Sequence, residues 1–440
     1  MPAMRVAFVS YHAAFDPSNG AARTMRDMMR MLARAGCETW SLTGACVDRP
    51  DERARSVALA ALGGEGRAHE EDGALILTND RGTPSLLFVP DVPNGPQPEP
   101  AERDAFLEHA RRLLGAMRPD VVLTYGGGAM GRQVIAEAKT GGAAVVFRIM
   151  NFRYRRKDLF DGVDGVLVPA RYVGDIYQRG LGIETHAIPC PLDASATVVP
   201  TPLRAPRTLT YVAPCPDKGL SWAARILDEL AIKRPDIPLL VVEGRGRLDA
   251  LAAAVSPEAR ARIQAVRTVP DPRSFLAGTR VLLMPSYVEP SGRLAQEAVL
   301  NGIPVVASAI GGLVETLAEA GILLPIPPRF AEQGNAPPPA AVTDWLAAIE
   351  RLFDDEAHYE AEARRCETAR ARWDEDRLAN EYLRFLEALR ASGSGTQPAL
   401  AASLAVLDRA RSLPSGRDAE PGSASAIAPL RTFPLADASD

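Results

Sequence analysis

The stretch of residues 281–315 reads VLLMPSYVEPSGRLAQEAVLNGIPVVASAIGGLVE, and it alternates segments typical of strands, turns and helices. Residues 281–284 form an apolar run of the kind found in buried strands, and residues 285–292 have turn chemistry. Residues 293–300 have helical composition, which an Asn-Gly pair brings to an end. The pattern predicts a strand, a turn and a helix, the order that builds a parallel α/β sheet.

The second half of this stretch repeats the pattern, because the apolar residues 303–307 run into Gly311-Gly312 and another helix start. Two helix N-termini therefore open at the carboxyl ends of neighbouring strands, where N–H groups and helix dipoles suit a diphosphate. Glu289 and Glu297 flank the first of these N-termini, so their carboxylates can accept hydrogen bonds from sugar hydroxyls. The alternative for Glu297 is a helix-surface ion pair with Arg293, worth about 0.2–0.5 kcal/mol.

These residues resemble the two-glutamate signature of retaining GT-B glycosyltransferases of the GT4 type, the glycosyl transferases group 1. A weaker likeness runs from about residue 4 to about residue 390. The resemblance implies that Glu289 lies near the donor sugar and the reacting centre, and that Glu297 holds the ribose hydroxyls. The donor-binding set that it implies is Glu297, Ser291, Gly292, Arg293, Gly311, Gly312 and Gly20.

A lysine-glycine pair, Lys218-Gly219, follows the predicted strand 208–213 and precedes a predicted helix. An ammonium at this edge of the sheet can neutralise a leaving diphosphate, so Lys218 joins Glu289 as a candidate catalytic residue. A solvated turn lysine is the alternative. Similar enzymes carry an arginine about five positions before this pair, and this chain has none there. Arg245 and Arg247 are the candidates to replace it, unless both are ordinary surface residues.

The first half of the chain offers candidates for the acceptor side. Gly20 precedes a predicted helix and resembles one glycine of the family's first-domain loop, although a plain turn explains it equally well. A second glycine turn follows Tyr125, where many relatives have a histidine that this chain lacks. Arg153, Arg155 and Arg156 cluster with Arg148 and Lys157 after a predicted strand. This cluster is either a solvated basic loop or a site for an anionic acceptor or lipid head group.

The composition permits two full domains, since 47% of the 440 residues are hydrophobic. The formal net charge of −5 gives no basis for general nucleic-acid binding. Residues 1–10 lack the long apolar segment of a signal peptide or membrane helix, so we expect a cytoplasmic protein, either free or peripheral to the membrane. The 5 cysteines and 5 histidines show no metal-ligand spacing, and no metal or cofactor is expected.

Short apolar strands alternate with helical stretches through nearly the whole chain, which predicts parallel sheets covered by helices. The expected fold class is α/β, of the GT-B type, with two Rossmann-like domains facing each other across a cleft. Prolines mark the domain boundary. The expected segments are an acceptor-side domain at 1–190, a hinge at 191–206, a nucleotide-sugar-binding domain at 207–371, a helix crossing back to the first domain at 372–391 and a disordered tail at 392–440. The insertion 65–100 has no assigned role.

The sequence thus predicts a metal-independent retaining glycosyltransferase, with hexose transfer preferred, that uses a nucleotide diphosphate sugar. A UDP-sugar is favoured as donor, and the acceptor is open, with an anionic or lipid-linked molecule as one choice. Two alternatives from other classes are a GT-B phosphorylase, which needs a site for inorganic phosphate, and a noncatalytic sugar-nucleotide-binding protein.

Overall fold

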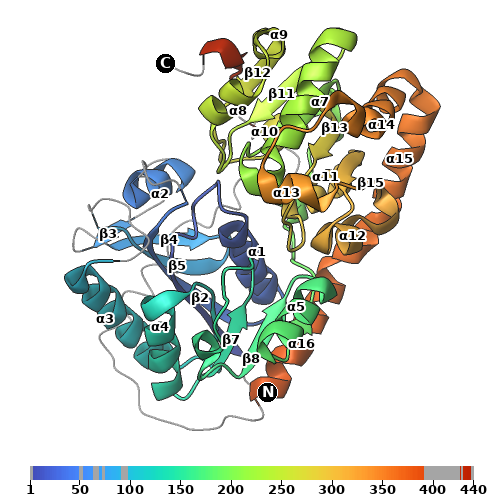
Figure 1. Cartoon of the computed structure of the whole chain (residues 1–440). Helices are drawn as coiled ribbons and strands as arrows, with labels where there is room; N and C mark the ends of the chain where they lie inside the picture. The colour runs from blue at the N-terminus through green and yellow to red at the C-terminus, as the bar shows by residue number, and fades with distance from the viewer. Residues whose placement is uncertain are drawn as a thin grey trace. The chain divides into compact units, whose positions relative to one another are not determined.

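The computed structural model describes residues 3–48, 53–62, 69–71, 75–90, 98–390, 427 and 430–437. These residues divide into two compact units, each built on its own sheet. The first unit combines the described parts of Met1–Leu192 and Trp373–Glu420, and the second those of Asp193–Arg372 and Pro421–Asp440. Each unit is an α/β structure with helices packed on its sheet (Figure 1). The predicted fold class is therefore confirmed for both.

The described residues of the first unit form a sheet with the strand order β3-β4-β5-β2-β1-β6-β7-β8-β9. Neighbours from β5 to β9 are parallel, and β3, β4 and β5 pair antiparallel. The strands are β1 (Arg5–His12), β2 (Glu38–Cys46), β3 (His69–Glu71), β4 (Leu75–Asp80), β5 (Thr83–Phe88), β6 (Val121–Thr124), β7 (Ala144–Arg148), β8 (Gly165–Val168) and β9 (His186–Ala187). The helices are α1 (Gly20–Arg34), α2 (Ala54–Leu62), α3 (Pro100–Met117), α4 (Gly128–Thr140), η2 (Lys157–Phe160), α5 (Arg171–Leu181) and α16 (Glu375–Arg390).

Part of the unassigned insertion 65–100 extends this sheet. Strands β4 and β5 form a hairpin whose two turn residues, Arg81 and Gly82, both have positive φ, at 53° and 94°. Such two-residue turns match the right-handed twist of the strands they join. Strand β5 pairs parallel with β2, so the hairpin adds its two strands to the sheet beside β2.

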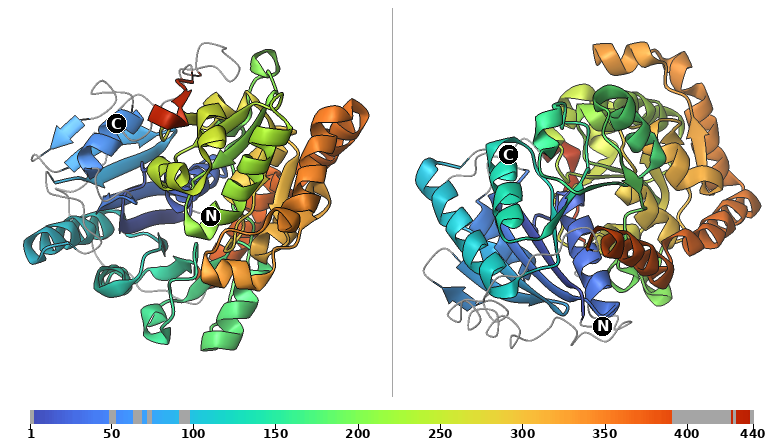
Figure 2. Two further views of the ribbon diagram at one scale, coloured as in Figure 1. Left: turned by 45° about the horizontal axis from the view of Figure 1, so that its top comes forward. Right: turned by 90° about the horizontal axis from the view of Figure 1, so that it is seen from below.

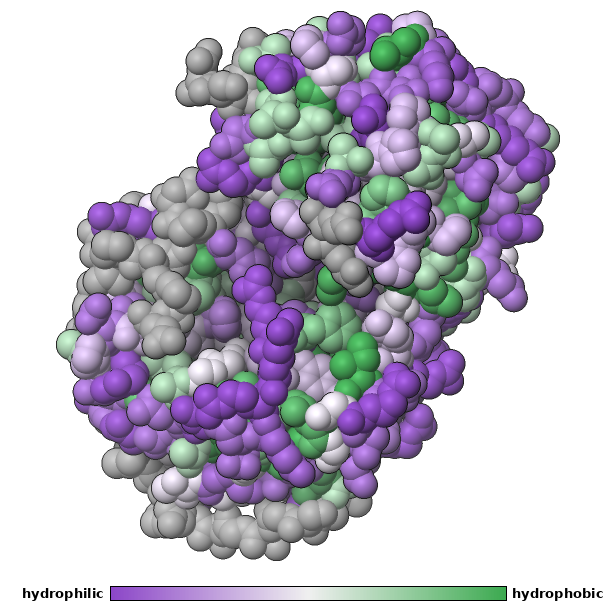
Figure 3. Space-filling view, viewed as in Figure 1, coloured by the Kyte–Doolittle hydropathy of each residue, from purple (hydrophilic) through white to green (hydrophobic). Residues whose placement is uncertain are grey.

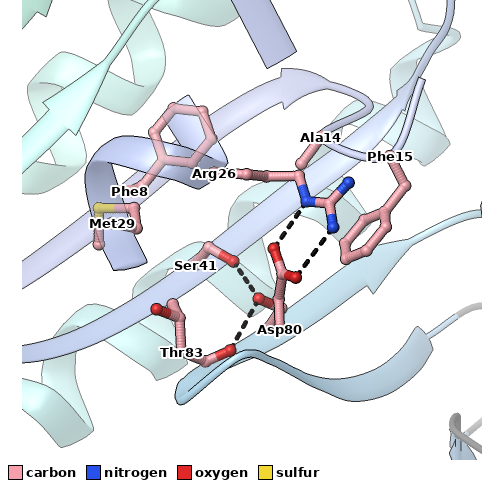
Figure 4. A pocket seen from close by; sticks show the side chains of 9 residues that line it. Phe8, Ala14, Phe15, Arg26, Met29, Ser41, Asp80 and Thr83 are labelled. Carbon is pink, nitrogen blue, oxygen red and sulfur yellow. Dashed lines mark hydrogen bonds and ion pairs between the residues drawn. The ribbon is translucent and has the colours of Figure 1, made fainter. Parts of the chain in front are cut away.

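A partly buried ion pair joins this hairpin to α1. Arg26 donates from Nε and Nη2 to the carboxylate of Asp80 at 2.6 and 2.9 Å, and its guanidinium lies 4.0 Å from the centroid of the Phe15 ring. Figure 4 shows the pair in a small pocket lined also by Phe8, Met29 and Ser41. Burial raises the pKa of Asp80, but the charge and hydrogen bonds of Arg26 outweigh it, so this pKa lies below its usual value.

We expect Arg26→Met to lower the free energy of unfolding of the first unit by about 1–3 kcal/mol at pH 7, because it leaves the partly buried Asp80 carboxylate without its hydrogen-bonded partner. Since the folded-state pKa of Asp80 is depressed, the pair's contribution is present above the unfolded pKa of about 3.9 and is lost as the pH falls through the folded pKa. Urea unfolding of the parent and of Asp80→Asn at several pH values measures the free energy of unfolding of each protein. The difference between the two free energies should shrink below about pH 4. If the difference in free energy of unfolding stays constant down to pH 2, the Asp80 carboxylate does not have the depressed pKa that the ion pair implies.

The second unit has the strand order β15-β14-β13-β10-β11-β12-β16 among its described residues. All neighbours are parallel except β12 and β16. The strands are β10 (Thr208–Val212), β11 (Leu239–Val242), β12 (Ile263–Val266), β13 (Thr279–Met284), β14 (Val305–Ser308), β15 (Gly321–Leu324) and β16 (Phe433–Pro434). The helices are α6 (Ala194–Thr197), η3 (Thr201–Leu203), η4 (Pro216–Lys218), α7 (Leu220–Lys233), α8 (Leu248–Ala254), α9 (Pro257–Arg262), α10 (Arg273–Leu276), α11 (Arg293–Leu300), α12 (Gly311–Leu317), η5 (Ala318–Ala320), α13 (Pro328–Gln333), η6 (Pro339–Val342), α14 (Thr343–Asp354), α15 (Glu356–Ala369), η7 (Arg370–Trp373, which ends in the first unit) and η11 (Leu435–Asp437).

The helices of this unit bury one face each, as their periodicity requires. Helix α7 buries Trp222, Ile226 and Leu230 at four-residue spacing, and Trp222 packs on Trp345 of α14 with ring centroids 6.2 Å apart. Hydrophilic side chains predominate on the outer surface of α14 and α15 in Figure 3. None of the described helices is both long and apolar enough to cross a membrane.

The proline-rich segment predicted as a hinge is largely folded onto the second unit. Helices α6 and η3 occupy much of residues 193–206, and Asn301 joins them to the end of α11. Its Oδ1 accepts from the Val199 N–H at 2.7 Å, and its Nδ2 donates to the Thr197 carbonyl at 3.0 Å. The hinge function of 191–206 stays a prediction.

Helix α16 packs on the first unit, beside α1 (Figure 2). It buries Leu378, Tyr382 and Leu386 at four-residue spacing, and the Tyr382 hydroxyl donates to the Pro189 carbonyl at 3.0 Å. The guanidinium of Arg148, which is fully buried at the end of β7, lies 5.8 Å from the Tyr382 ring. Arg148 is therefore structural, and its inclusion in the predicted basic cluster was wrong.

The prediction of a disordered tail over residues 392–440 was wrong for residues 430–437. Phe433-Pro434 pairs antiparallel with β12, and Leu435 is fully buried in the core of the second unit. The composition averaged over the whole tail does not reveal this short apolar segment. A strand that adds to an existing sheet edge needs only a few residues. The rest of 392–440, apart from residue 427, lies outside the described residues.

Candidate functional site: the carboxyl edge of the second sheet

Four loops meet at the carboxyl ends of β14, β13, β10 and β11, which are consecutive in the sheet. Backbone hydrogen bonds tie them together, since the Asp217 carbonyl after β10 accepts from the Tyr287 N–H after β13 at 2.9 Å. The Glu289 carbonyl in turn accepts from the Gly312 N–H after β14 at 2.9 Å. This is the sheet edge where parallel α/β folds bind ligands.

Two glycines permit this close approach. A Cβ on Gly219, whose φ is +71°, would lie 1.8 Å from the Pro285 carbonyl oxygen, and one on Gly312 would lie 1.8 Å from that of Pro290. Any side chain there would push the loops apart. The Gly312 N–H already donates to the backbone carbonyl of Glu289. A role for that N–H in donor binding therefore finds no support here.

Lys218 and Glu289 form an ion pair in which Lys218 Nζ donates to Glu289 Oε2. Their side chains are 20% and 8% exposed, so the reading of Lys218 as a solvated turn lysine is wrong. Lys218 ends η4 and Glu289 lies on the turn after β13. The pair places one positive and one negative group at the same point of the sheet edge.

Glu297 and Arg293 lie on α11, whose N-terminus follows this turn. Arg293 Nε donates to Glu297 Oε1 at 2.8 Å, and the two side chains are 11% and 1% exposed. The i,i+4 pair considered as an alternative is therefore present, but it is buried and not on the surface. Gly292 caps the helix with a φ of +83° and no side-chain hydrogen bond, which leaves the first-turn N–H groups without a capping side chain.

Gln296 is a residue that the sequence analysis missed. It is 1% exposed, its Nε2 donates to Ser291 Oγ at 3.4 Å, and its Oε1 has no hydrogen-bond partner among the described residues. Its position directly before Glu297 was the only signal for it.

The two arginines considered as replacements for the missing one differ in place. Arg245 Nη2 lies 4.0 Å from Asp217 Oδ2, next to Lys218, whereas Arg247 pairs with Asp249 at 2.6 Å and is 73% exposed. Arg245 therefore lies beside the site. No group of three or more His, Cys, Asp or Glu side chains in the described part of the chain is arranged to hold a metal ion.

In the first unit, the glycine turn after β6 lies against a histidine from β1. The His12 ring stacks on Tyr125 with centroids 5.2 Å apart, and a Cβ on Gly126 would lie 2.9 Å from His12 Cδ2. Burial lowers the pKa of His12, and the charge of Asp16 offsets only part of this. In the sequence, glycines and no histidine directly follow Tyr125. The tertiary structure supplies one from a neighbouring strand.

The other first-unit candidates are less constrained. Gly20 is the exposed first residue of α1, and Asn19 Oδ1 caps the helix by accepting from the Ala21 and Ala22 N–H groups. The capping side chain already uses two of the N–H groups that the predicted glycine turn would offer. Arg153, Arg155 and Arg156 are exposed, and Arg156 donates to Asp158 at 2.9 Å.

Comparisons with known proteins agree with this description. Residues 206–355 match the family model "Glycosyl transferases group 1". The 2-deoxystreptamine glucosyltransferase of Streptomyces kanamyceticus is 32% identical over 151 residues, which are 34% of this chain and 36% of the relative. The D-inositol 3-phosphate glycosyltransferase of Corynebacterium aurimucosum is 30% identical over 148 residues, 32% of each chain. The chain thus spans about a third of the length of these curated relatives.

Solved structures extend the likeness to the whole fold. Sucrose-phosphate synthase from Thermosynechococcus elongatus matches with a TM-score of 0.62 at 18% identity, over 88% of this chain and 100% of that one. The Anabaena protein HepE, in complex with UDP and glucose, matches with a TM-score of 0.62 at 14% identity over 88% and 100% of the two chains. The GT-B fold is confirmed. The predicted resemblance to the glycosyl transferases group 1 is confirmed as well, with the family match on the second unit.

Proposed function

We propose that the protein is a retaining glycosyltransferase that moves a hexose from a UDP-sugar to an acceptor hydroxyl. The observation that carries this proposal is the Lys218–Glu289 pair beside the uncapped N-terminus of α11, with Glu297 one turn further along. The names of the curated relatives support sugar transfer, and the UDP in the HepE complex supports the choice of donor.

The charges of the site suit the departure of a diphosphate. As the bond from the anomeric carbon to the phosphate oxygen breaks, negative charge grows on the diphosphate, and the Lys218 ammonium and the α11 N–H groups stabilise it. The Glu289 carboxylate, freed from Lys218 by the incoming diphosphate, accepts hydrogen bonds from the sugar and faces the positive charge of its ring. The acceptor oxygen then bonds to the anomeric carbon from the same face, and its proton passes to the leaving phosphate oxygen.

The nucleotide is held by the second carboxylate. Glu297 is fixed by Arg293, so its carboxylate is oriented before the ribose arrives and little side-chain entropy is lost on binding. We further propose that Arg153, Arg155 and Arg156 contact an anionic acceptor. The name of one relative, D-inositol 3-phosphate glycosyltransferase, supports a phosphate-bearing acceptor as the first to be tried.

The test of this proposal is the affinity for UDP. Glu297→Gln should weaken UDP binding by about 10–100-fold, because a charged hydrogen bond to a ribose hydroxyl contributes about 1.5–3 kcal/mol. Isothermal titration calorimetry measures the affinity, and Glu319→Gln, an exposed glutamate after α12, is the matched control. Equal UDP affinity in the parent and Glu297→Gln would reject the ribose assignment.

A further inference from the structure

The C-terminal segment 430–437 covers the open edge of the second sheet. Phe433 lies opposite Ala265 and Pro434 opposite Gln264 of β12, which would otherwise be the edge strand on that side. Pro434 has no N–H, which suits a strand that has no partner on its outer side among the described residues. In Figure 1 this red segment lies beside α8, α9 and β12.

Leu435 is the most deeply buried side chain of the described part of this segment. Leu435 begins η11, which lies against α8, α9 and β12, and it is fully buried among the core residues of the unit. The neighbouring Ala436 is exposed. Burial of a leucine is among the larger contributions that a single side chain makes to docking. Phe433 packs against the same core and is partly buried. The segment therefore has two apolar side chains on the core and a short backbone pairing, which is how extended peptides bind to sheet edges.

A second contact links the segment to the candidate donor site. The Phe433 ring lies 5.5 Å from the guanidinium of Arg267, and Arg267 Nη1 pairs with Glu243 Oε1 at 3.0 Å. Glu243 is 3% exposed and begins the turn 243–247 that follows β11.

Backbone contacts fix this turn against the loop before Lys218, and Arg245 in the turn lies 4.0 Å from Asp217, the residue before Lys218. The Gly246 N–H donates to the Glu243 carbonyl at 2.8 Å, and Thr268 Oγ1 donates to the Gly244 carbonyl at 2.7 Å. A Cβ on Gly246 would lie 2.3 Å from the Pro214 nitrogen, so the turn rests directly on the loop that leads to Lys218. The path from Phe433 to Arg245 thus runs through Arg267 and Glu243, all within the second unit.

We propose that residues 430–437 form a strap that docks on β12, α8 and α9 and holds the turn 243–247 in the conformation that presents Arg245 at the diphosphate end of the donor site. Phe433 and Leu435 are positioning residues, and Arg245 is the group they position. The docking stands on the structure of the second unit, and the diphosphate part rests on the proposed function.

The test uses the full chain with Leu435→Asp, which makes burial of this side chain unfavourable, and Ala436→Asp, which adds the same charge at an exposed neighbour. Because an undocked strap frees the turn, trypsin should cut after Arg245 and Arg247 at least about fivefold faster in Leu435→Asp than in the parent. Mass spectrometry identifies these cuts. UDP affinity should fall by about three- to tenfold, and Ala436→Asp should behave as the parent in both assays.

A synthetic peptide of residues 428–438 provides the rescue. Added to Leu435→Asp, it should bind and restore both trypsin resistance at the turn and UDP affinity, whereas the same peptide carrying Leu435→Asp should do neither. Unchanged cleavage at Arg245 and Arg247 in Leu435→Asp would overturn the strap. Restored protection without any change in UDP affinity would overturn its link to the donor. Absence of UDP binding by the parent would count against the proposed function, while the trypsin and peptide assays would still decide the docking.

Discussion

Lys218→Met is expected to lower the turnover of a UDP-sugar by about 10²–10³-fold, equal to about 2.7–4 kcal/mol of transition-state stabilisation. The reason is that, in the proposed mechanism, the ammonium stabilises the charge that develops on the leaving diphosphate. The variant keeps the apolar stem while removing the charge. Release of UDP in the presence of donor and acceptor, or of donor and water, measures the turnover. A turnover within about threefold of the parent would remove Lys218 from the catalytic residues.

Two controls separate catalysis from folding in this experiment. Lys233→Met removes an exposed lysine at the end of α7 and should leave the turnover unchanged. Loss of Lys218 also leaves the nearly buried Glu289 carboxylate without its ion-pair partner, which lowers stability. The double variant Lys218→Met/Glu289→Gln should recover part of the melting temperature and none of the turnover. Recovery of turnover together with stability would show that the lysine acts only through folding.

Glu289→Gln is expected to lower kcat by about 10²-fold or more while changing donor affinity by less than about threefold. In the proposed mechanism its carboxylate faces the positive charge that forms at the sugar ring in the transition state, and this charge is absent from the bound donor. Kinetics with varied UDP-sugar concentration separate the two effects, with Glu319→Gln as control. An equal loss in affinity and in kcat/KM, with kcat unchanged, would make Glu289 a binding residue.

The same reaction reports the stereochemistry. Proton NMR of the first product formed by the parent should show the anomeric configuration of the donor. An inverted product would reject the proposed same-face displacement, and it would require a base at the acceptor side. In that event His12 becomes the first residue to substitute, because burial favours its neutral form and it lies at the end of β1 against the glycine turn after β6.

Local features of both sheets follow from the order of residues. The stretch 281–315 predicted a strand, a turn, a helix over 293–300 and a second strand, and β13, α11 and β14 lie there. These elements depend on side-chain periodicity and on turn residues, which act between neighbours a few positions apart. The position of Gly219 directly before a helix could likewise be predicted, because a residue with a left-handed backbone conformation often joins a turn to a helix.

The placement of charged groups depended on long-range packing. Arg148 and Arg153 are close in sequence, yet the first is fully buried against α16 and the second is exposed. Arg245 and Arg247 are two residues apart, yet only Arg245 reaches the Lys218 turn. Such differences depend on which distant segment packs against each position, and a single sequence contains no local signal for it.

The sequence by itself determined the α/β class, the strands β10, β13 and β14 of the second unit and the pair of glutamates, because each depends on local pattern or on a motif confined to one stretch. Strands β12, β15 and β16 were not predicted. Only the tertiary structure decided that Lys218 pairs with Glu289, that His12 meets the glycine turn after Tyr125 and that Leu435 fills the core beside α8 and α9. Each of these contacts joins residues separated by many positions. The strand order brings them together, and strand order is fixed by the packing of the whole sheet.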